Sequence, residues 1–235
     1  MSQLSQKEIE DFYRQVNNVW PDNDKWHDIS QLEIQKYIHR FCFTNCTILN
    51  AGSGGNNYGL TNEMIHVDIA ENKIKNTKKY YVCSIENMPF QNESFDVIIC
   101  VGSVLNYCDA VKAINEMSRV LKPGGILILE FENSYSFEFM KTAAYKTNAS
   151  IITTNYFNKP HKMWVYSPNY ISKILSEEKM IVKDVRTFHI LSSLSYYYNR
   201  NENKAAKYAS LDKIFRHIPI IRKHSGNIIL FAKKQ

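Results

Sequence analysis

The 235-residue sequence lacks the features that mark several large classes of protein. Its five cysteines (Cys42, Cys46, Cys83, Cys100 and Cys108) are odd in number and form no CxxC pair, which argues against a disulfide framework or a zinc site. No apolar run approaches the roughly 20 residues that a bilayer-spanning helix needs, so we expect no membrane segment. The first residues, MSQLSQKEIEDFYRQ, are polar and mixed in charge. They argue against a secretory signal and predict a cytoplasmic protein.

The composition predicts one globular domain over residues 1–235, because 44% of the residues are hydrophobic and 22% are charged. The net charge of +6 would suit an anionic partner such as nucleic acid. The lysines and arginines are scattered, however, with modest enrichment in Lys73–Lys79 and Lys204–Lys223. This pattern favours a solvated basic face and argues against a nucleic-acid partner. We expect a monomer or homodimer with no membrane partner.

The stretch Thr47–Gly55, TILNAGSGG, is an apolar run that ends in small residues. It predicts a buried strand that turns sharply into a helix, because glycine permits positive φ and close approach of a ligand. A second apolar run ends in Asp68, where a carboxylate can accept hydrogen bonds from both hydroxyls of a ribose. A third run, Phe95–Val101, is followed by Gly102 and Ser103, which would keep the neighbouring crevice open. Together these features predict a cofactor cradle.

Four blocks of sequence carry a resemblance to a known family. They are LNAGSGG, VDIAENKI at Val67–Ile74, SIENMPFQNESFDVIICVGSVLNY at Ser84–Tyr107, and RVLKPGGILILEFE at Arg119–Glu132. On these blocks the chain resembles the class I S-adenosylmethionine-dependent methyltransferases, and in pattern the small-molecule enzymes of the ubiquinone-biosynthesis type. The resemblance implies methyl transfer from S-adenosylmethionine to an oxygen or nitrogen of a small-molecule acceptor.

The resemblance also implies which residues hold the cofactor. Gly52 and Gly54 would admit the methionine portion, Asp68 would hold the ribose, and Ser84 with Ile85 would border the adenine. The full set of implied cofactor residues is Tyr13, Trp26, Asn50, Gly52, Ser53, Gly54, Asp68, Ile69, Ser84, Ile85, Val101 and Ser103.

Three positions within or beside these sequence blocks depart from the family pattern. Asn50 stands where the family usually has an acid facing the methionine amino group, and its amide oxygen can accept from an ammonium without carrying charge. Ser84 replaces the acid that meets the adenine amine, so either its hydroxyl or Glu86 would take that part. Asn56 replaces the third glycine, and asparagine tolerates left-handed backbone better than most residues. These departures bear on affinity for the cofactor more than on its identity.

Apolar positions at helical spacing predict two helices before the first strand, over residues 4–20 and Trp26–Phe43. In the resembled family such a segment often lies over the cofactor. Residues 1–45 are therefore expected to form a helical lid, with Tyr13, Trp20, Trp26 and His27 either in the site wall or in ordinary helix packing.

The remaining pattern predicts an α/β fold: a doubly wound, seven-stranded Rossmann-like sheet with helices on both faces. Residues 46–132 would form the cofactor-binding half and 133–235 a substrate-facing half, with an aromatic insertion after the fifth strand. Expected elements include a short helix near Asn57–Thr61, a helix over 109–121, and a helix over Pro168–Met180 with Ser167 as N-cap. Glu130 and Glu132 alternate with Leu129 and Phe131 at the end of the fifth strand.

Methyl transfer from a sulfonium is a displacement on an activated carbon, so the protein mainly aligns the reactants. A hydroxyl or protonated amine acceptor needs a general base, and histidine is the natural one near neutral pH. His161, in the insertion Asn133–Lys162, is the first candidate, ahead of His189 and His27. Asn106 and Tyr107 follow the fourth strand and are expected to face the methyl group and the acceptor. No metal-ligand spacing is present, which argues against a metal-assisted mechanism.

Three other functions fit the sequence less well than methyl transfer to a small molecule. A nicotinamide dehydrogenase shares the glycine turn and the acid, but the GxGxxG pattern fails at Asn57. An RNA- or protein-directed methyltransferase would suit the basic charge, although no appended nucleic-acid module is visible. A non-catalytic methyltransferase-like partner subunit would suit the substitutions at Asn50, Asn56 and Ser84, and cofactor binding would separate it from an enzyme.

Overall fold

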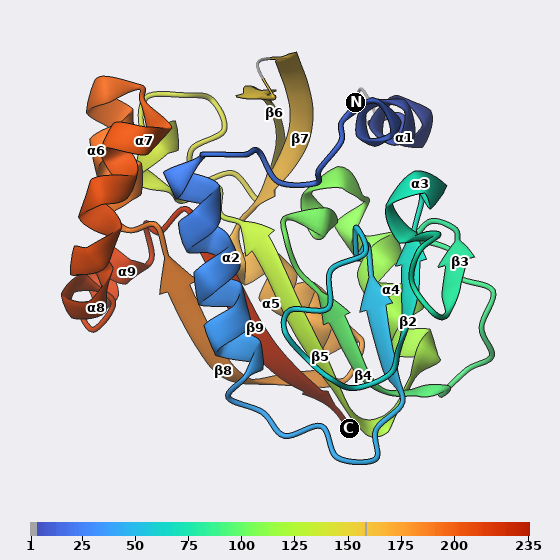
Figure 1. Ribbon diagram of the computed structural model, residues 1–235. Helices are drawn as coiled ribbons and strands as arrows, with labels where there is room; N and C mark the ends of the chain where they lie inside the picture. The colour runs from blue at the N-terminus through green and yellow to red at the C-terminus, as the bar shows by residue number, and fades with distance from the viewer. Residues whose placement is uncertain (1–3, 158) are drawn as a thin grey trace.

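A seven-stranded sheet forms the centre of the computed structural model, which describes residues 4–157 and 159–235. The strand order is β3-β2-β1-β4-β5-β9-β8 (Figure 1). Neighbouring strands from β3 to β5 are parallel, whereas β9 runs antiparallel to both β5 and β8. The predicted seven-stranded α/β sheet is therefore confirmed. Its strands are β1 (Ile48–Ala51), β2 (Met64–Asp68), β3 (Tyr80–Val82), β4 (Phe95–Cys100), β5 (Leu121–Glu132), β8 (Met180–Phe188) and β9 (Asn227–Lys234).

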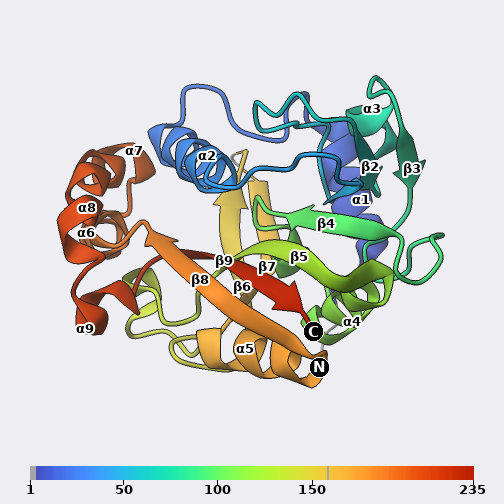
Figure 2. The same cartoon turned by 90° about the horizontal axis from the view of Figure 1, so that it is seen from below.

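Helices cover both faces of this sheet, as predicted. Figure 2 shows α2 on one face and α4 with α5 on the other. None of the described helices is long and apolar enough to cross a membrane. The α-helices are α1 (Gln6–Gln15), α2 (Lys25–Ile38), α3 (Glu71–Ile74), α4 (Ala110–Val120), α5 (Pro168–Glu177), α6 (Leu191–Asn199), α7 (Glu202–Ala205), α8 (Asp212–Phe215) and α9 (Pro219–Arg222); the 3₁₀ helices are η1 (Val104–Tyr107), η2 (Phe137–Phe139) and η3 (Ala206–Leu211).

Alternate side chains of the central strands enter two separate cores. Leu49 and Ile98 pack with residues of α4 and α5. Their chain neighbours Ile48 and Ile99 pack on the opposite face, against α2. Successive strand residues point to opposite faces, so a strand that is covered on both sides is apolar at nearly every position. This explains the unbroken apolar runs of the sequence.

The helix predicted near Asn57–Thr61 is wrong, because the chain forms turns there. The Asn56 Oδ1 atom accepts a hydrogen bond from the Tyr58 amide at 2.7 Å, and the Asn57 Oδ1 atom accepts one from the Gly59 amide at 3.0 Å. Such local bonds from asparagine side chains compete with helix formation.

Several element ends also differ from the predictions. The two N-terminal helices form but end early, α1 at Gln15 and α2 at Ile38. The fifth strand begins at Leu121, directly after α4, rather than at Gly125. Residues 1–3 of the expected lid and residue 158 of the aromatic insertion lie outside the described residues.

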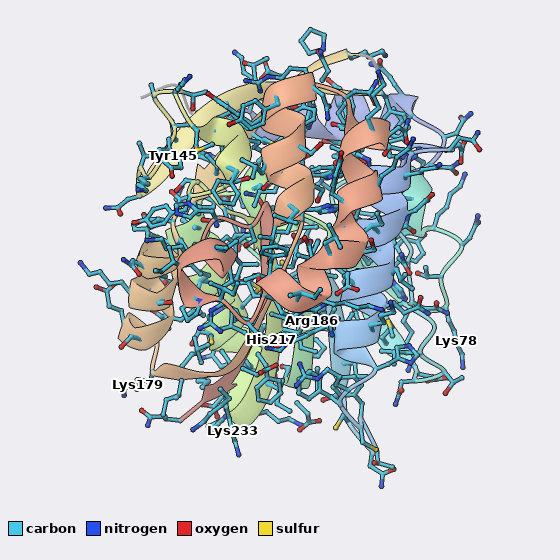
Figure 3. All side chains as sticks on the ribbon, turned by 90° about the vertical axis from the view of Figure 1, so that its left-hand side faces the viewer. Lys78, Tyr145, Lys179, Arg186, His217 and Lys233 are labelled. Carbon is cyan, nitrogen blue, oxygen red and sulfur yellow. The ribbon has the colours of Figure 1, made fainter. Side chains whose placement is uncertain are left out.

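Two segments lie outside this α/β framework. The insertion after β5 forms η2 and a separate hairpin of β6 (Ala149–Tyr156) and β7 (Lys159–Tyr166), which the sequence analysis did not predict. Figure 3 looks onto the C-terminal helices beside α2. The second segment, α6 to α9, lies between β8 and β9. Each segment begins at the carboxyl end of a strand, the first after β5 and the second after β8.

The N-cap of α5 gives a test of local stability. The Ser167 Oγ atom accepts from the Tyr170 amide at 3.1 Å, as predicted, and the residue is fully buried. Replacing such a cap by alanine costs about 1 kcal/mol. We expect Ser167→Ala to lower the free energy of unfolding by about that amount in urea titrations. The matched change Ser176→Ala, at an exposed position of the last turn, should have almost no effect. Equal effects of the two changes would contradict this role of Ser167.

Candidate active site

A cavity opens at the carboxyl edge of the sheet, where the strand order reverses between β1 and β4. Open α/β sheets bind ligands at this point, because the chain leaves neighbouring strands in opposite directions and creates a crevice. One part of the wall comes from the ends of β1, β2 and β3. The other part comes from the ends of β4 and β5 and from the two added segments. The cavity therefore has two chemically different ends.

The loop after β1 leaves no room for side chains at two positions. Gly52 and Gly54 have φ of +69° and +52°. A Cβ atom on Gly52 would clash with the Val104 side chain, and one on Gly54 would lie 2.7 Å from the Val19 Cγ1 atom. Both glycines are required by backbone conformation and by close approach.

Asp68, at the end of β2, fixes this loop. Its Oδ2 atom accepts from the Gly54 amide at 2.9 Å and its Oδ1 atom accepts from the Ala70 amide at 2.9 Å. Burial raises the pKa of the carboxyl, against the lowering effect of these two hydrogen bonds. Each carboxylate oxygen has a lone pair left for a further donor from the cavity.

Ser84 and Ile85 follow β3 and line the same end. The Ser84 Oγ atom accepts from the Gln6 Nε2 atom of α1 at 2.9 Å, so the first helix is tied to the cavity rim. The alternative role for Glu86 is wrong, because its Oε1 atom accepts from the Asp109 amide at 2.8 Å and the residue does not line the cavity.

Asn50 also lies outside the cavity wall, contrary to the prediction. Its Nδ2 atom donates to the Asn56 carbonyl at 2.7 Å and its Oδ1 atom accepts from the Tyr58 hydroxyl at 3.3 Å. An acid would face that carbonyl without a proton to donate. The choice of asparagine at position 50 is therefore explained by its hydrogen bonds to the loop containing Asn56 and Tyr58, and needs no ligand in the cavity.

Residues of the N-terminal segment form part of the cavity wall. Tyr13, Trp20 and Trp26 all line the wall. The Lys73 Nζ atom donates to the Asn17 carbonyl at 2.9 Å, and the Tyr156 hydroxyl donates to the Val19 carbonyl at 2.6 Å. These bonds hold residues 16–20 across the opening.

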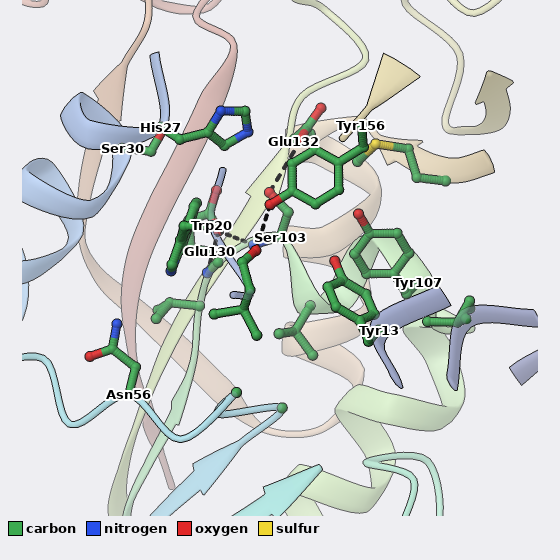
Figure 4. Close-up of a pocket in the computed structure, with 18 of the residues that line it drawn as sticks. Tyr13, Trp20, His27, Ser30, Asn56, Ser103, Tyr107, Glu130, Glu132 and Tyr156 are labelled. Atoms are coloured by element: carbon green, nitrogen blue, oxygen red, sulfur yellow. Dashed lines mark hydrogen bonds between the residues drawn. The ribbon is translucent and has the colours of Figure 1, made fainter. Parts of the chain in front are cut away.

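The far end of the cavity is acidic and rich in tyrosine (Figure 4). The Glu130 Oε2 atom accepts from the Gly102 and Ser103 amides at 2.8 and 2.6 Å, so this carboxylate supports the loop after β4. The Glu132 Oε1 atom accepts from the Ser103 hydroxyl at 3.2 Å. Other residues at this end are Tyr13, Tyr107, Glu138, Tyr156, Tyr196 and Glu202.

Burial raises the pKa of these carboxyls. It raises that of Glu132 well above its ordinary value, and those of Glu138 and Glu202 to about 7. Within residues 4–157 and 159–235, no lysine or arginine nitrogen lies within 4.0 Å of the carboxylates of Glu130, Glu132, Glu138 or Glu202. The sequence alone does not predict this end of the cavity. The alternation of Glu130 and Glu132 is its only local signal, since Glu138 and Glu202 come from later segments.

The three predicted catalytic residues differ in whether they line the cavity. Tyr107 lines the cavity, and burial raises the pKa of its hydroxyl. Asn106 does not line it: its Nδ2 atom donates to the Trp164 carbonyl at 2.7 Å and its Oδ1 atom accepts from the Glu132 amide at 2.9 Å. Asn106 therefore joins the end of β5 to β7 and cannot face an acceptor.

His161 is also misplaced by the prediction. It is buried behind the wall, with ring centroids 4.3 Å from Phe12 and 5.1 Å from Tyr107, and its Nε2 atom has no hydrogen-bond partner. Burial lowers its pKa to about 4. His189 is likewise buried, stacked on Trp26 with centroids 3.9 Å apart. Among the three histidines considered, only His27 reaches the cavity.

Asp24, His27 and Glu202 bring three side chains together, with potential metal-ligating atoms within 4.8 Å of one another. No local spacing in the sequence predicts this cluster, because Glu202 lies far along the chain from the other two. These residues extend the acidic end of the cavity toward α2 and α7.

Comparison with known proteins bears on the first half of the chain most directly. The family model for the methyltransferase domain matches residues 48–129. An uncharacterised protein of Methanocaldococcus jannaschii is 30% identical over 142 residues, covering 58% of this chain and 53% of that protein. The ubiquinone/menaquinone biosynthesis C-methyltransferase of Rickettsia akari is 29% identical over 174 residues, covering 59% of this chain and 70% of that enzyme. This chain thus spans about half the length of the first of these relatives.

The fold recurs among solved structures. The cyclase SpnF superimposes with a TM-score of 0.64 at 14% identity, covering 100% of this chain and 97% of its own. A likeness at that identity shows the fold alone. The domain match, the relatives and the strand order agree in making this chain similar to the class I S-adenosylmethionine-dependent methyltransferases.

Proposed function

We propose that this chain transfers the methyl group of S-adenosylmethionine to an oxygen or nitrogen of a small-molecule acceptor. One observation carries the proposal: a single cavity joins the glycine loop, Asp68 and Ser84 to a second end of carboxylates and tyrosines. The first end suits a nucleoside cofactor. The second suits an acceptor that loses a proton.

The residues of the first end fit the cofactor. The turn at Gly52 and Gly54 lets a ligand approach the backbone closely, and Asp68 has lone pairs for two ribose hydroxyls. The buried Ile85 side chain offers an apolar surface for a purine ring. When bound, the cofactor supplies a methyl group that its sulfonium already activates, so alignment is the protein's main task.

The second end supplies groups that hold and deprotonate an acceptor. Burial raises the pKa of Tyr13, Tyr107 and Tyr156, so these hydroxyls stay neutral and act as hydrogen-bonding groups rather than as bases. The pKa of Glu138, raised by burial to about 7, suits proton acceptance near neutral pH, and burial also raises the pKa of Glu132. We assign the base to these carboxylates in place of His161.

The enclosure favours a small acceptor. Residues 16–20 from the N-terminal segment, Tyr156 from the hairpin and Glu202 from α7 border the same cavity. We accordingly propose residues 1–45 as the lid, 46–132 as the cofactor half and 133–235 as the part that completes the acceptor end. The relative from Rickettsia akari is named a C-methyltransferase, which makes an activated carbon the second candidate acceptor atom.

The cofactor register can be tested through Asp68. We expect Asp68→Ala to weaken binding of S-adenosylhomocysteine by at least about tenfold in calorimetric titrations, because hydrogen bonds to charged groups contribute about 1.5–3 kcal/mol. The control Glu71→Gln changes a nearby exposed acid and should leave the affinity within about twofold. Unchanged binding in a well-folded Asp68→Ala variant would contradict the assignment of this carboxylate to the ribose.

The burial of His161 behind the cavity wall can be tested through the pH at which its imidazole takes up a proton. With a folded-state pKa of about 4, its imidazole should stay neutral from pH 8 to pH 5.5. The unfolded chain takes up this proton near pH 6.5, so this histidine's contribution to stability is present above pH 6.5 and lost as pH falls toward 4. NMR of the ring protons, assigned with a His161→Gln variant, should show no shift over that range. A midpoint near 6.5 would return His161 to the candidates for a base.

A further inference from the structure

We propose that the acceptor is a cationic amine, which the acidic and aromatic end of the cavity binds through Glu132 and Glu138. This inference rests on the proposed function, since it names the substrate class of the same site. It follows from the charge that the walls leave uncompensated and from the rings that surround it.

The charge balance of the two ends is unequal. Lys73 is the only lysine among the described residues that lines the cavity, and it donates to backbone carbonyls of residues 16 and 17 beside the Asp68 end. The other end holds Glu130, Glu132, Glu138 and Glu202, and no lysine or arginine among the described residues lies within 4.0 Å of their carboxylates.

Uncompensated carboxylates in a partly buried site are costly, because removal from water disfavours the charged form. Glu130 has evident structural partners: its oxygens accept two hydrogen bonds from the loop after β4 and one from the Asn227 Nδ2 atom of β9. Glu132 has one hydroxyl donor, Ser103, and Glu138 extends into the same cavity from η2. A ligand that carries positive charge would restore ionisation at these two carboxylates.

Aromatic rings surround the same space. Tyr13 and Tyr107 meet edge to face with centroids 5.8 Å apart, and Tyr156 lies across from them beside Glu132 (Figure 4). Ring faces attract ammonium groups, and this attraction is strongest where water is excluded. Carboxylates together with tyrosines favour an amine over a carboxylic acid, which the same glutamates would repel, and over an alcohol, which can donate a hydrogen bond but carries no positive charge to pair with them.

The chemistry balances with these groups alone. The ammonium proton passes to a glutamate carboxylate, which leaves a lone pair on nitrogen. That lone pair forms the new N–C bond to the methyl carbon as the C–S bond of the sulfonium breaks, leaving a neutral thioether. The positive charge then resides on the methylated nitrogen.

The test uses three probes of similar size: 2-phenylethylamine, 2-phenylethanol and phenylacetate. Each is titrated into full-length protein saturated with S-adenosylhomocysteine, and binding is followed by ligand-observed NMR. We expect the amine to bind at least about tenfold more tightly than the alcohol at pH 8, and the acid to bind weakest, as for a charge-assisted contact. Equal affinities, or preference for the alcohol or acid, would overturn the inference.

Variants locate the contact. Glu132→Gln and Glu138→Gln keep the side-chain shape and should each weaken amine binding at least about tenfold, while the affinity for S-adenosylhomocysteine stays within about twofold. Glu177→Gln, on an exposed turn of α5, is the matched control and should change neither affinity. If the glutamine variants lose S-adenosylhomocysteine rather than the amine, these carboxylates serve the cofactor's ammonium and the inference is wrong.

Amine affinity should also rise from pH 6 to pH 8, as the Glu138 carboxyl, with its pKa of about 7, becomes ionised. Four charged or titratable groups act on Glu138: Glu132 on β5, Tyr196 on α6, Arg200 after α6 and Glu202 on α7. Glu202 is in turn affected by Asp24, the N-cap of α2, and by His27 on α2. A flat profile would contradict the role of this carboxylate.

The two proposals fail separately. Wild-type protein that is folded but does not bind S-adenosylhomocysteine would overturn the proposed function, and the amine acceptor with it. Wild-type protein that binds S-adenosylhomocysteine but does not prefer the amine would overturn only the substrate class.

Discussion

The hydrogen bond from the Gly54 amide to the Asp68 carboxylate joins the end of β1 to the end of β2, and the cavity is arranged around it. It holds the loop in a backbone conformation that only glycine adopts easily at two positions. The same carboxylate also accepts from the Ala70 amide, at the start of α3. One half-buried acid therefore sets both the turn and the donors and acceptors that a nucleoside would meet.

The other end of the cavity follows a different principle. Its carboxylates are gathered from β5, η2 and α7, three segments with no local sequence relation. Keeping several acids together opposes folding when, as among the described residues here, no lysine or arginine lies within 4.0 Å, since each acid must be desolvated beside like charges. An arrangement of this kind is typical of functional sites, where perturbed pKa values are maintained by the rest of the fold. The acidic end is thus the part of the molecule that most strongly indicates a ligand-binding site.

Sequence reasoning succeeded where spacing along the chain carried the information. Apolar runs ending in Gly52, Asp68 and Ser103 predicted the strands and the side of the sheet where the cavity lies. It failed where tertiary contacts decided the outcome: Asn50 and Asn106 are taken up by backbone groups, and His161 is buried behind the wall. The hairpin β6–β7 and the meeting of Glu202 with Asp24 depend on long-range packing that no local pattern encodes.

We propose that one cavity holds cofactor and acceptor at opposite ends, and a crystal structure of the protein with S-adenosylhomocysteine would show whether it does. We expect the ribose on Asp68, the purine beside Ser84 and Ile85, and the thioether sulfur turned toward the space between Tyr107 and Glu132. A purine bound instead among Glu132, Glu138 and Tyr156 would contradict this arrangement, because the cofactor would then occupy the end proposed for the acceptor.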